Sequence, residues 1–426
     1  MSATSEHPLL SRRAAITVFL AFASAYFLST LIRAITATLS PTLTLEMGLN
    51  ARDLGLLAGG YFLGFSLTQL PLGSWLDRFG PKKVNIAFLA VAVLGCLAFA
   101  TATSFVGLLA ARMLCGVGLS ACLMAPLTGY RRWFDSTAQL RTNSWMLMAG
   151  SLGMLTSTLP VQWLMPLYGW RALFVGLAVL VVVTMALISM LVPAWVPAAN
   201  SPANPAGASA ASPETMPNTG YSEVWRNAYF WRMTPVGFFS YGGMVAIQTL
   251  WAGPWMTQVG GWSSIEAATG LFGINLTMLC TFWTWGLITP KLVRRGIHPN
   301  TLIAWGVPLS LLVLVALILS AEALGPWTAA VLALFCLTSS FVSLAQPAVG
   351  QAFPAALAGR ALSAYNLVIF AGIFVVQWGI GLMVDLFKSL GWGTVASFQG
   401  AMTVFLICSI LSYGYFLKSK PDNQHP

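Results

Sequence analysis

Charged residues are scarce in this sequence: Asp, Glu, Lys and Arg together make up 8% of its 426 residues. Soluble proteins usually carry about 25%, so the composition excludes most soluble folds, disordered tails and coiled coils. Hydrophobic residues make up 57% of the chain, or about 243 residues. At roughly 20 residues per bilayer crossing, that is material for about twelve helices. The composition therefore predicts an all-α polytopic membrane protein.

Groups that hold metals or catalyse reactions are also few. The six cysteines all fall inside apolar segments, at spacings that fit neither a zinc site nor a disulfide framework. The three histidines lie outside the apolar segments, and no acidic residue lies near the middle of one. Without a nucleophile, metal cluster or carboxylate pair in the membrane, we expect no enzymatic activity and no cofactor. The missing membrane carboxylate also disfavours proton-driven export of cations.

Apolar runs bounded by charges, Gly and Pro predict twelve spans: 14–39, 53–76, 84–103, 105–129, 140–165, 171–192, 231–257, 265–289, 301–320, 326–350, 361–386 and 394–417. An even number of spans places both termini on one side of the membrane. That side carries 16 Lys and Arg, against three on the other. The positive-inside rule then places both termini in the cytoplasm, and we expect an integral protein of the cell (inner) membrane.

The start of the chain and its net charge are also consistent with a membrane protein. The apolar run from Ala14 to Ile32 follows Arg12-Arg13 and is too long for the apolar core of a signal peptide, so it predicts the first span. The formal net charge is +10. Because most of the excess lies on the cytoplasmic side, it reports topology rather than a nucleic-acid partner.

A polar gap and an internal repeat divide the chain in two. The gap runs from about Pro197 to Gly220, is rich in Pro, Ala, Ser and Asn, and predicts a flexible linker. Matching residues recur in the same order at offsets of 213 to 221: Tyr26 and Tyr241, Gly73 and Gly286, Cys115 and Cys336, Arg141 and Arg360. We expect parallel six-helix halves, 1–196 and 226–426, joined by a linker at 197–225. Such a repeat places a substrate site between the halves near the bilayer midplane.

Two sequence motifs lie in the first half of the chain. The loop after the second span reads Gly73-Ser-Trp-Leu-Asp77-Arg78-Phe-Gly80-Pro-Lys82-Lys83 and resembles the G-x-x-x-D-R-x-G-R-R loop of the major facilitator superfamily. The fourth span carries Arg112-Met-Leu-Cys-Gly116-Val-Gly118, which resembles the family's R-x-x-x-G-x-G pattern. With twelve spans, a central linker and parallel halves, the resemblance covers nearly the whole chain. It implies the family's fold of two six-helix halves, and transport by alternating access.

The resemblance also implies that this loop latches the cytoplasmic ends of the halves in one transport state. Its gating residues are Gly73, Asp77, Arg78, Gly80, Lys82 and Lys83. On physical grounds Gly73 permits close helix packing and Gly80 a tight turn. Asp77 is placed to pair with Arg78 or Arg132, and the two lysines suit the cytoplasmic headgroups. The alternative is a solvated loop that only sets topology, for which the acid is superfluous. In the second half Pro290 replaces the acid, so a latch there is weaker or absent.

Two arginines, Arg33 and Arg112, fall within predicted spans. A charge inside the bilayer is costly unless it faces protein or water, so both are candidates for function. The family resemblance implies that spans 1, 4, 7 and 10 line a central cavity, where both would meet Gln248, the counterpart of Arg33 in the repeat. A guanidinium is a planar donor fork that suits carboxylate, nitrate or phosphate oxygens. The alternatives are hydrogen bonds to helix carbonyls for Arg33, and helix packing or proton coupling for Arg112.

Further polar residues extend the predicted substrate site. Tyr26 precedes Arg33 by seven residues, as Tyr241 precedes Gln248, which puts each pair on one helix face. Two amides on later spans, Asn366 and Gln346, are also predicted to bind substrate. They come from a wider set that includes Gln69, Asn143, Asn275 and Gln377. For each amide the alternative is a hydrogen bond between helices.

These features predict a secondary transporter that moves a small anion, an organic carboxylate, by alternating access. Proton cotransport, anion exchange and facilitated diffusion all fit, so a proton is a candidate coupling partner. The rival functions are efflux of amphipathic compounds, a membrane sensor or assembly factor that does not transport, and copper import, since the 17 methionines offer soft ligands. We expect a monomer whose partners are the anion and membrane lipid, and no nucleic acid.

Overall fold

The computed structural model describes residues 10–134, 136–195 and 221–419, and the regular elements in these ranges are all helices. In lipid every backbone N–H and C=O must find a partner within the protein, which a helix supplies by itself. The first half of the chain forms α1 (Arg12–Met47), α2 (Ala51–Leu67), α3 (Gln69–Thr101), α4 (Phe105–Leu119), α5 (Met124–Trp133), α6 (Ser136–Thr156) and α7 (Leu159–Leu191).

The second half contains α-helices, π-helical segments and short 3-10 segments. In chain order they are α8 (Tyr221–Arg226), α9 (Ala228–Pro235), η2 (Val236–Tyr241), α10 (Gly242–Ala246), η3 (Ile247–Trp251), α11 (Ala252–Pro254), η4 (Trp255–Val259), α12 (Ser264–Arg294), α13 (Pro299–Ser320), η5 (Ala321–Trp327), α14 (Thr328–Ser339), η6 (Ser340–Leu344), α15 (Ala345–Gln351), α16 (Ala355–Ser389) and α17 (Thr394–Lys418). The predicted linker, 197–225, begins outside the described residues, and all of α8 except Arg226 falls within it. The proposed division into 1–196, 197–225 and 226–426 stays a prediction.

Eight helical stretches among the described residues are long and apolar enough to cross a membrane. Some of them hold two crossings. The stretch Pro299–Gln351 has 53 residues, or ~80 Å at 1.5 Å per residue, and it is interrupted by η5. The helices α3 and α7 bend where Gly80 (φ 79°) and Gly169 (φ 71°) take positive φ, a conformation that favours glycine.

Divided at these breaks, with consecutive helices of one crossing joined, the described helices other than α8 and η5 form twelve segments. They are 12–47, 51–79, 81–101, 105–133, 136–168, 170–191, 228–259, 264–294, 299–320, 328–351, 355–389 and 394–418. Each overlaps one predicted span, which is consistent with twelve crossings. By this count α1 begins and α17 ends at the same end of the molecule, called here the terminal end. The opposite end is called the far end.

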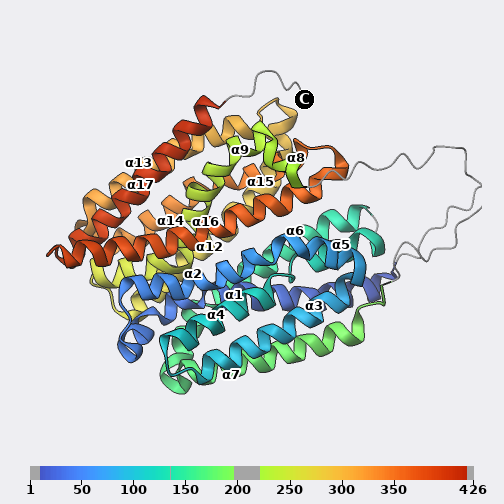
Figure 1. Ribbon diagram of the computed structural model, residues 1–426, viewed down its shortest axis with the longest axis horizontal. Coiled ribbons are helices and arrows are strands. Elements are labelled where there is room, and N and C mark those ends of the chain that lie inside the picture. Colours follow the sequence, from blue (N-terminus) through green and yellow to red (C-terminus); the bar gives the residue numbers. More distant parts are fainter. Residues whose placement is uncertain (1–9, 135, 196–220, 420–426) are drawn as a thin grey trace, which may run out of the picture.

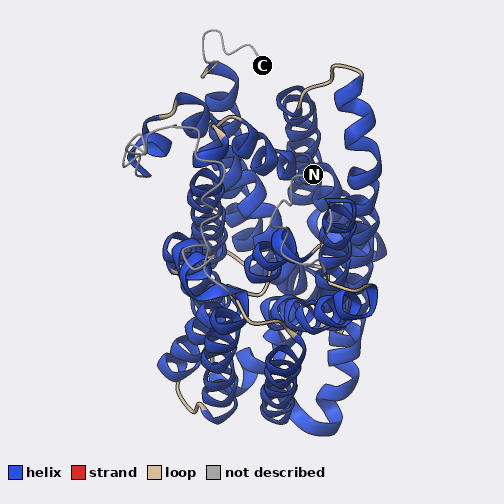
Figure 2. Cartoon of the chain, turned by 90° about the vertical axis from the view of Figure 1, so that its right-hand side faces the viewer, coloured by secondary structure: helices blue, strands red, loops and turns tan. Residues whose placement is uncertain are grey.

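The helices form two groups that follow the chain. Figure 1 separates α1 to α7, in blue to green, from α9 to α17, in yellow-green to red, and Figure 2 shows a quarter-turned view of the same bundle. The two groups touch most extensively along α2 and α16. Midway along this interface the rings of Phe65 and Phe370 lie with their centroids 4.2 Å apart. This interface fixes how the two halves face each other.

At the far end the same two helices are joined by backbone contacts. The carboxylate of Asp385 on α16 accepts hydrogen bonds from the backbone N–H groups of Ala51 (3.2 Å) and Arg52 (2.7 Å) at the start of α2. Gly381 lies against Ala51, and Gly55 against Gln377, so closely that a Cβ on either glycine would overlap the opposing backbone. Small residues are what lets two membrane helices approach to this distance. The halves are therefore closed on each other at the far end.

Candidate functional site

A cavity of about 100 Å³ lies between the two halves. Of the predicted site residues it brings together Arg33, Tyr241 and Gln248. The remaining lining residues are Ser151, Met154, Met244, Val245, Asn275, Met278, Phe282, Phe370 and Ile373. Asn275 was among the wider set of candidate amides, whereas the methionines and phenylalanines were not predicted. Nothing in their spacing separates them from residues that simply fill the core.

The lining comes from spans 1, 5, 7, 8 and 11. We expected spans 1, 4, 7 and 10, and among the described residues spans 4 and 10 contribute none to this cavity. The reason is that α6 and α12 pack against each other across the interface between the halves. The key side chains of spans 4 and 10 are engaged elsewhere, as described below.

Arg33 supplies the positive charge of the cavity. Its guanidinium donates to the Sδ atom of Met154 at 3.7 Å, and its Nε is buried without a hydrogen-bond partner among the described residues. Tyr26 and Tyr241 lie close enough to interact with its charge, and Tyr26 packs beside the cavity against Gly150. No lining residue is acidic. Arg33 is thus a half-buried cation that contacts the Met154 sulfur and the Tyr26 hydroxyl, with no counter-ion among the described lining residues.

Gln248 and Asn275 form the polar patch on the opposite half. Gln248 lies on η3, within a span in which η2, η3 and η4 are all π-helical, and π turns often occur at functional sites. The Nε2 of Gln248 donates to the Oδ1 of Asn275 at 2.9 Å. The Nδ2 of Asn275 in turn donates to the carbonyl of Leu271 at 2.9 Å. Both amides are therefore held in one orientation.

Arg112 lies next to the cavity but faces away from it. Its side chain is fully buried and donates to the carbonyl oxygens of Ile32 (2.7 Å) and Arg33 (3.2 Å) and to the Oγ1 of Thr36 (2.5 Å). Its Cζ also lies 5.3 Å from the centroid of the Tyr61 ring. The guanidinium is therefore engaged with α1 in this conformation. It holds the helix turn that carries Arg33.

Gln346 and Asn366 form a pair of their own. The Nε2 of Gln346 on α15 donates to the Oδ1 of Asn366 on α16 at 2.5 Å. Neither residue lines the cavity. The neighbouring Tyr365 donates to the carbonyl of Met233, near the start of span 7. This contact places the amide pair toward the terminal end, where it joins helices of the second half.

The gating loop turns at Gly80 and packs under Trp195. Gly80 is buried with φ 79°, as its predicted tight turn requires, and a Cβ there would overlap the indole of Trp195. The Nζ of Lys82 donates to the carbonyl of Val192 at 2.8 Å. The guanidinium of Arg132 lies 4.0 Å from the Trp195 ring centroid. The loop is thus held by the end of span 6, within its own half.

The other gating residues are exposed. Gly73, Asp77, Arg78 and Lys83 all lie on the surface. We expected Gly73 to permit close helix packing, which is wrong for this conformation, because a Cβ there would meet nothing within 4 Å. Among the described residues Asp77 forms no ion pair, and the Cζ of Arg78 instead lies 5.1 Å from the ring centroid of Phe79. The expected latch between the halves is not formed here.

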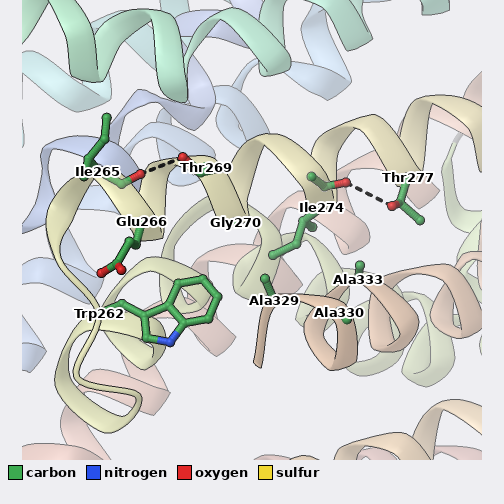
Figure 3. Close-up of a pocket in the computed structure, with 11 residues that line it drawn as sticks. Trp262, Ile265, Glu266, Thr269, Gly270, Ile274, Thr277, Ala329, Ala330 and Ala333 are labelled. Atoms are coloured by element: carbon green, nitrogen blue, oxygen red, sulfur yellow. Dashed lines mark hydrogen bonds between the residues drawn. The ribbon is translucent and has the colours of Figure 1, made fainter. Parts of the chain in front are cut away.

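A larger hollow of about 480 Å³ lies between α12 and α14, away from these residues. Figure 3 shows Trp262 and Glu266 at one end of it and small alanines of α14 along its floor. Its only charged lining residue is Glu266, whose carboxylate accepts from Ser263. An acidic rim does not suit an anion. The cavity at Arg33 is therefore the better candidate site.

Comparison with known proteins identifies a family model, described as the Major Facilitator Superfamily, that matches residues 22–377. The 4-hydroxybenzoate transporter PcaK of Pseudomonas aeruginosa is 30% identical over 147 residues, which cover 34% of this chain and 33% of that protein. The probable sulfoacetate transporter SauU of Cupriavidus necator is 27% identical over 158 residues, covering 36% and 35%. The hexuronate transporter of Escherichia coli is 24% identical over 139 residues, covering 33% and 32%. The match thus spans about a third of each of these relatives.

Two solved structures resemble almost the whole chain. A bacterial homologue of the human lysosomal transporter Spinster, in an inward-facing and unoccupied conformation, aligns with a TM-score of 0.76 at 15% identity, covering 96% of this chain and 98% of that one. A D-xylose-proton symporter aligns with a TM-score of 0.75 at 14% identity, covering 96% and 98%. At these identities the likeness concerns the fold alone.

Proposed function

This chain belongs to the Major Facilitator Superfamily, and we propose that it carries a small organic anion, a carboxylate, across the membrane by alternating access. The observation that carries the proposal is the cavity between the halves, which holds Arg33 and no acidic lining residue. A cation within the membrane without a counter-ion is costly even when it is half-buried. An anion that enters the cavity supplies the missing charge, and its oxygens suit the guanidinium fork.

The named relatives support an organic acid. Their names specify 4-hydroxybenzoate, sulfoacetate and hexuronate, which are three different organic anions. Each match spans about a third of either protein, which is less than a whole two-half site. The relatives therefore support the charge class of the substrate more than its identity.

The size of the cavity argues against efflux of large amphipathic compounds. Drug-sized ligands occupy pockets of about 300–1,000 Å³, whereas the cavity at Arg33 measures about 100 Å³. A small carboxylate fits that space better. Efflux would require a conformation in which the halves separate much further.

The remaining roles follow from the contacts. We assign Arg33 as the charge anchor, with Tyr26, Tyr241 and Gln248 around it, and Arg112 as a positioning residue that acts through α1. Gln346 and Asn366 are assigned to helix pairing. The gating loop around Asp77 is proposed to latch the halves in a conformation other than this one. We place the protein in the inner membrane with cytoplasmic termini, on the uneven distribution of Lys and Arg.

Uptake into proteoliposomes tests the proposal, with labelled mono- and dicarboxylates as substrates. A hydrogen bond to a charged group contributes about 1.5–3 kcal/mol, so Arg33→Gln should weaken apparent affinity by about 10- to 150-fold. Arg171→Gln is the control, because Arg171 pairs with Glu46 outside the cavity. If folded Arg33→Gln protein transports these anions as well as the wild type does, the anchor assignment is wrong.

A further inference from the structure

The cavity offers one positive charge, which limits the charge of its ligand. Among the residues that the structure describes, Arg33 is the only cation lining the cavity. The second membrane arginine, Arg112, already donates three hydrogen bonds to α1. A ligand with two negative charges would therefore leave one of them buried without a cation, which is costly in a site of low dielectric constant. The charge balance favours a single carboxylate.

The opposite wall offers a hydrogen-bond acceptor, and the amide network determines which atom it is. The carbonyl of Leu271 accepts, so Asn275 must direct its Nδ2 toward it. This leaves the Oδ1 of Asn275 facing Gln248, which must direct its own Nε2 there. Beside the N–H that it donates to Asn275, the Gln248 amide has a second N–H and an oxygen. The Oε1 accepts no hydrogen bond among the described residues, so it is the acceptor that Gln248 has free for a ligand. That oxygen accepts hydrogen bonds and cannot donate them.

Apart from these two groups, Asn275 and the hydroxyl groups of Tyr241 and Ser151, the described lining residues are apolar. Met154 and Met244 lie beside Arg33 and Gln248, and Phe282 and Phe370 complete the walls. Thioether and phenyl groups favour the apolar body of a ligand and offer it little hydrogen bonding. A volume of about 100 Å³ keeps that body short.

We propose that the substrate is a small monocarboxylate with a hydrogen-bond donor, such as a hydroxyl group, at the end remote from its carboxylate. The carboxylate binds Arg33 on α1, and the hydroxyl donates to the Oε1 of Gln248 on η3. The proposal rests on the proposed anion transport and narrows its substrate class. Because the two groups belong to opposite halves, one ligand molecule links both halves when it binds.

The inference is tested on the full-length protein by measuring how tightly each acid of two matched sets binds, or how strongly it competes with a transported acid. The aromatic set is benzoate, 4-hydroxybenzoate, 4-methoxybenzoate and terephthalate. The aliphatic set is pentanoate, 5-hydroxypentanoate, 5-methoxypentanoate and glutarate. In at least one set the hydroxy acid should bind about 3- to 10-fold more tightly than its methyl ether, because the ether lacks the O–H that donates one neutral hydrogen bond. The dicarboxylate should bind more weakly than the hydroxy acid.

Two matched variants assign the effect to one atom. Gln248→Met removes the acceptor at nearly constant side-chain volume and should abolish the preference for the hydroxy acid. Gln346→Met is the control, since Gln346 makes the same type of amide bond to Asn366 outside the cavity, and the preference should persist there. A preference that persists in folded Gln248→Met protein overturns the inference.

The inference and the proposed function fail in different ways. If acids bind in an Arg33-dependent manner but the hydroxy acid and its ether compete equally, anion transport stands and the substrate class is wrong. If the dicarboxylate binds most tightly, the single-charge argument is wrong. If no acid of either set binds in an Arg33-dependent manner, the proposed function itself is wrong.

Discussion

Replacing Gly381 by alanine should open the far end of the protein. A Cβ at this position would lie 2.8 Å from the carbonyl carbon of Ala51 on the other half, closer than such atoms approach. Neither partner can move away as a flexible side chain would, because the obstacle is backbone. Overpacking of this kind costs about 1–3 kcal/mol, and the cost applies only while α2 and α16 touch. The equilibrium should therefore shift by about 5- to 150-fold toward conformations with separated far ends.

Spin labels at the far end measure this shift. Leu45 and Leu390 are 85% and 64% exposed and lie on opposite halves, so pulsed electron resonance between labels there reports the separation. Gly379→Ala is the matched control, because a Cβ at Gly379 meets nothing within 4 Å. Both substitutions replace a glycine within a helix by alanine, so both gain about 1 kcal/mol of helix propensity and this effect cancels in the comparison. If Gly381→Ala and Gly379→Ala give the same distance distribution, the backbone contact does not close the far end.

Three further substitutions test other contacts. Gly80→Ala should lower the melting temperature, because the residue has φ 79° and lies under Trp195. Gly73→Ala is the control: it lies in a helix with open space around it, so the melting temperature should stay the same or rise slightly. Equal melting temperatures of the two variants would refute this. Asp385→Asn keeps one oxygen that can accept a hydrogen bond from the start of α2 but loses the negative charge. It should therefore weaken the cap that Asp385 forms on α2, which contributes about 0.5–2 kcal/mol. The distance between the labels at positions 45 and 390 should increase less than in Gly381→Ala. Arg112→Lys keeps the charge but cannot span three acceptors, so it should weaken anion affinity about tenfold; wild-type affinity would refute its positioning role.

The fold was predictable because it depends on local patterns. Apolar runs define membrane helices whatever they pack against, and Gly80 predicted its own turn from the motif around it. Tyr241 and Gln248 were also placed in the cavity, since the repeat relates them to Tyr26 and Arg33. Each of these inferences used residues close in the sequence or related by one offset.

Contacts between distant helices were not predictable in this way. The partners of Arg112 depend on how closely α4 approaches α1, which the sequence of neither helix specifies. Asp385 and Ala51 are 334 residues apart, so no spacing rule pairs them. Gly73 shows the opposite error: its motif indicates a closely packed position, yet a Cβ there would meet nothing within 4 Å.

The position of Trp195 provides an internal spectroscopic reporter. Its indole covers the turn of the gating loop, faces the Arg132 guanidinium at 4.0 Å and meets Trp133 edge-on at 6.3 Å. A ring between a cation and a second indole has an emission spectrum and a fluorine chemical shift that respond to small displacements of either. With 5-fluorotryptophan in the chain and Trp195→Phe to assign its signal among the 17 tryptophans, rearrangement of this loop can be followed in solution without an attached label.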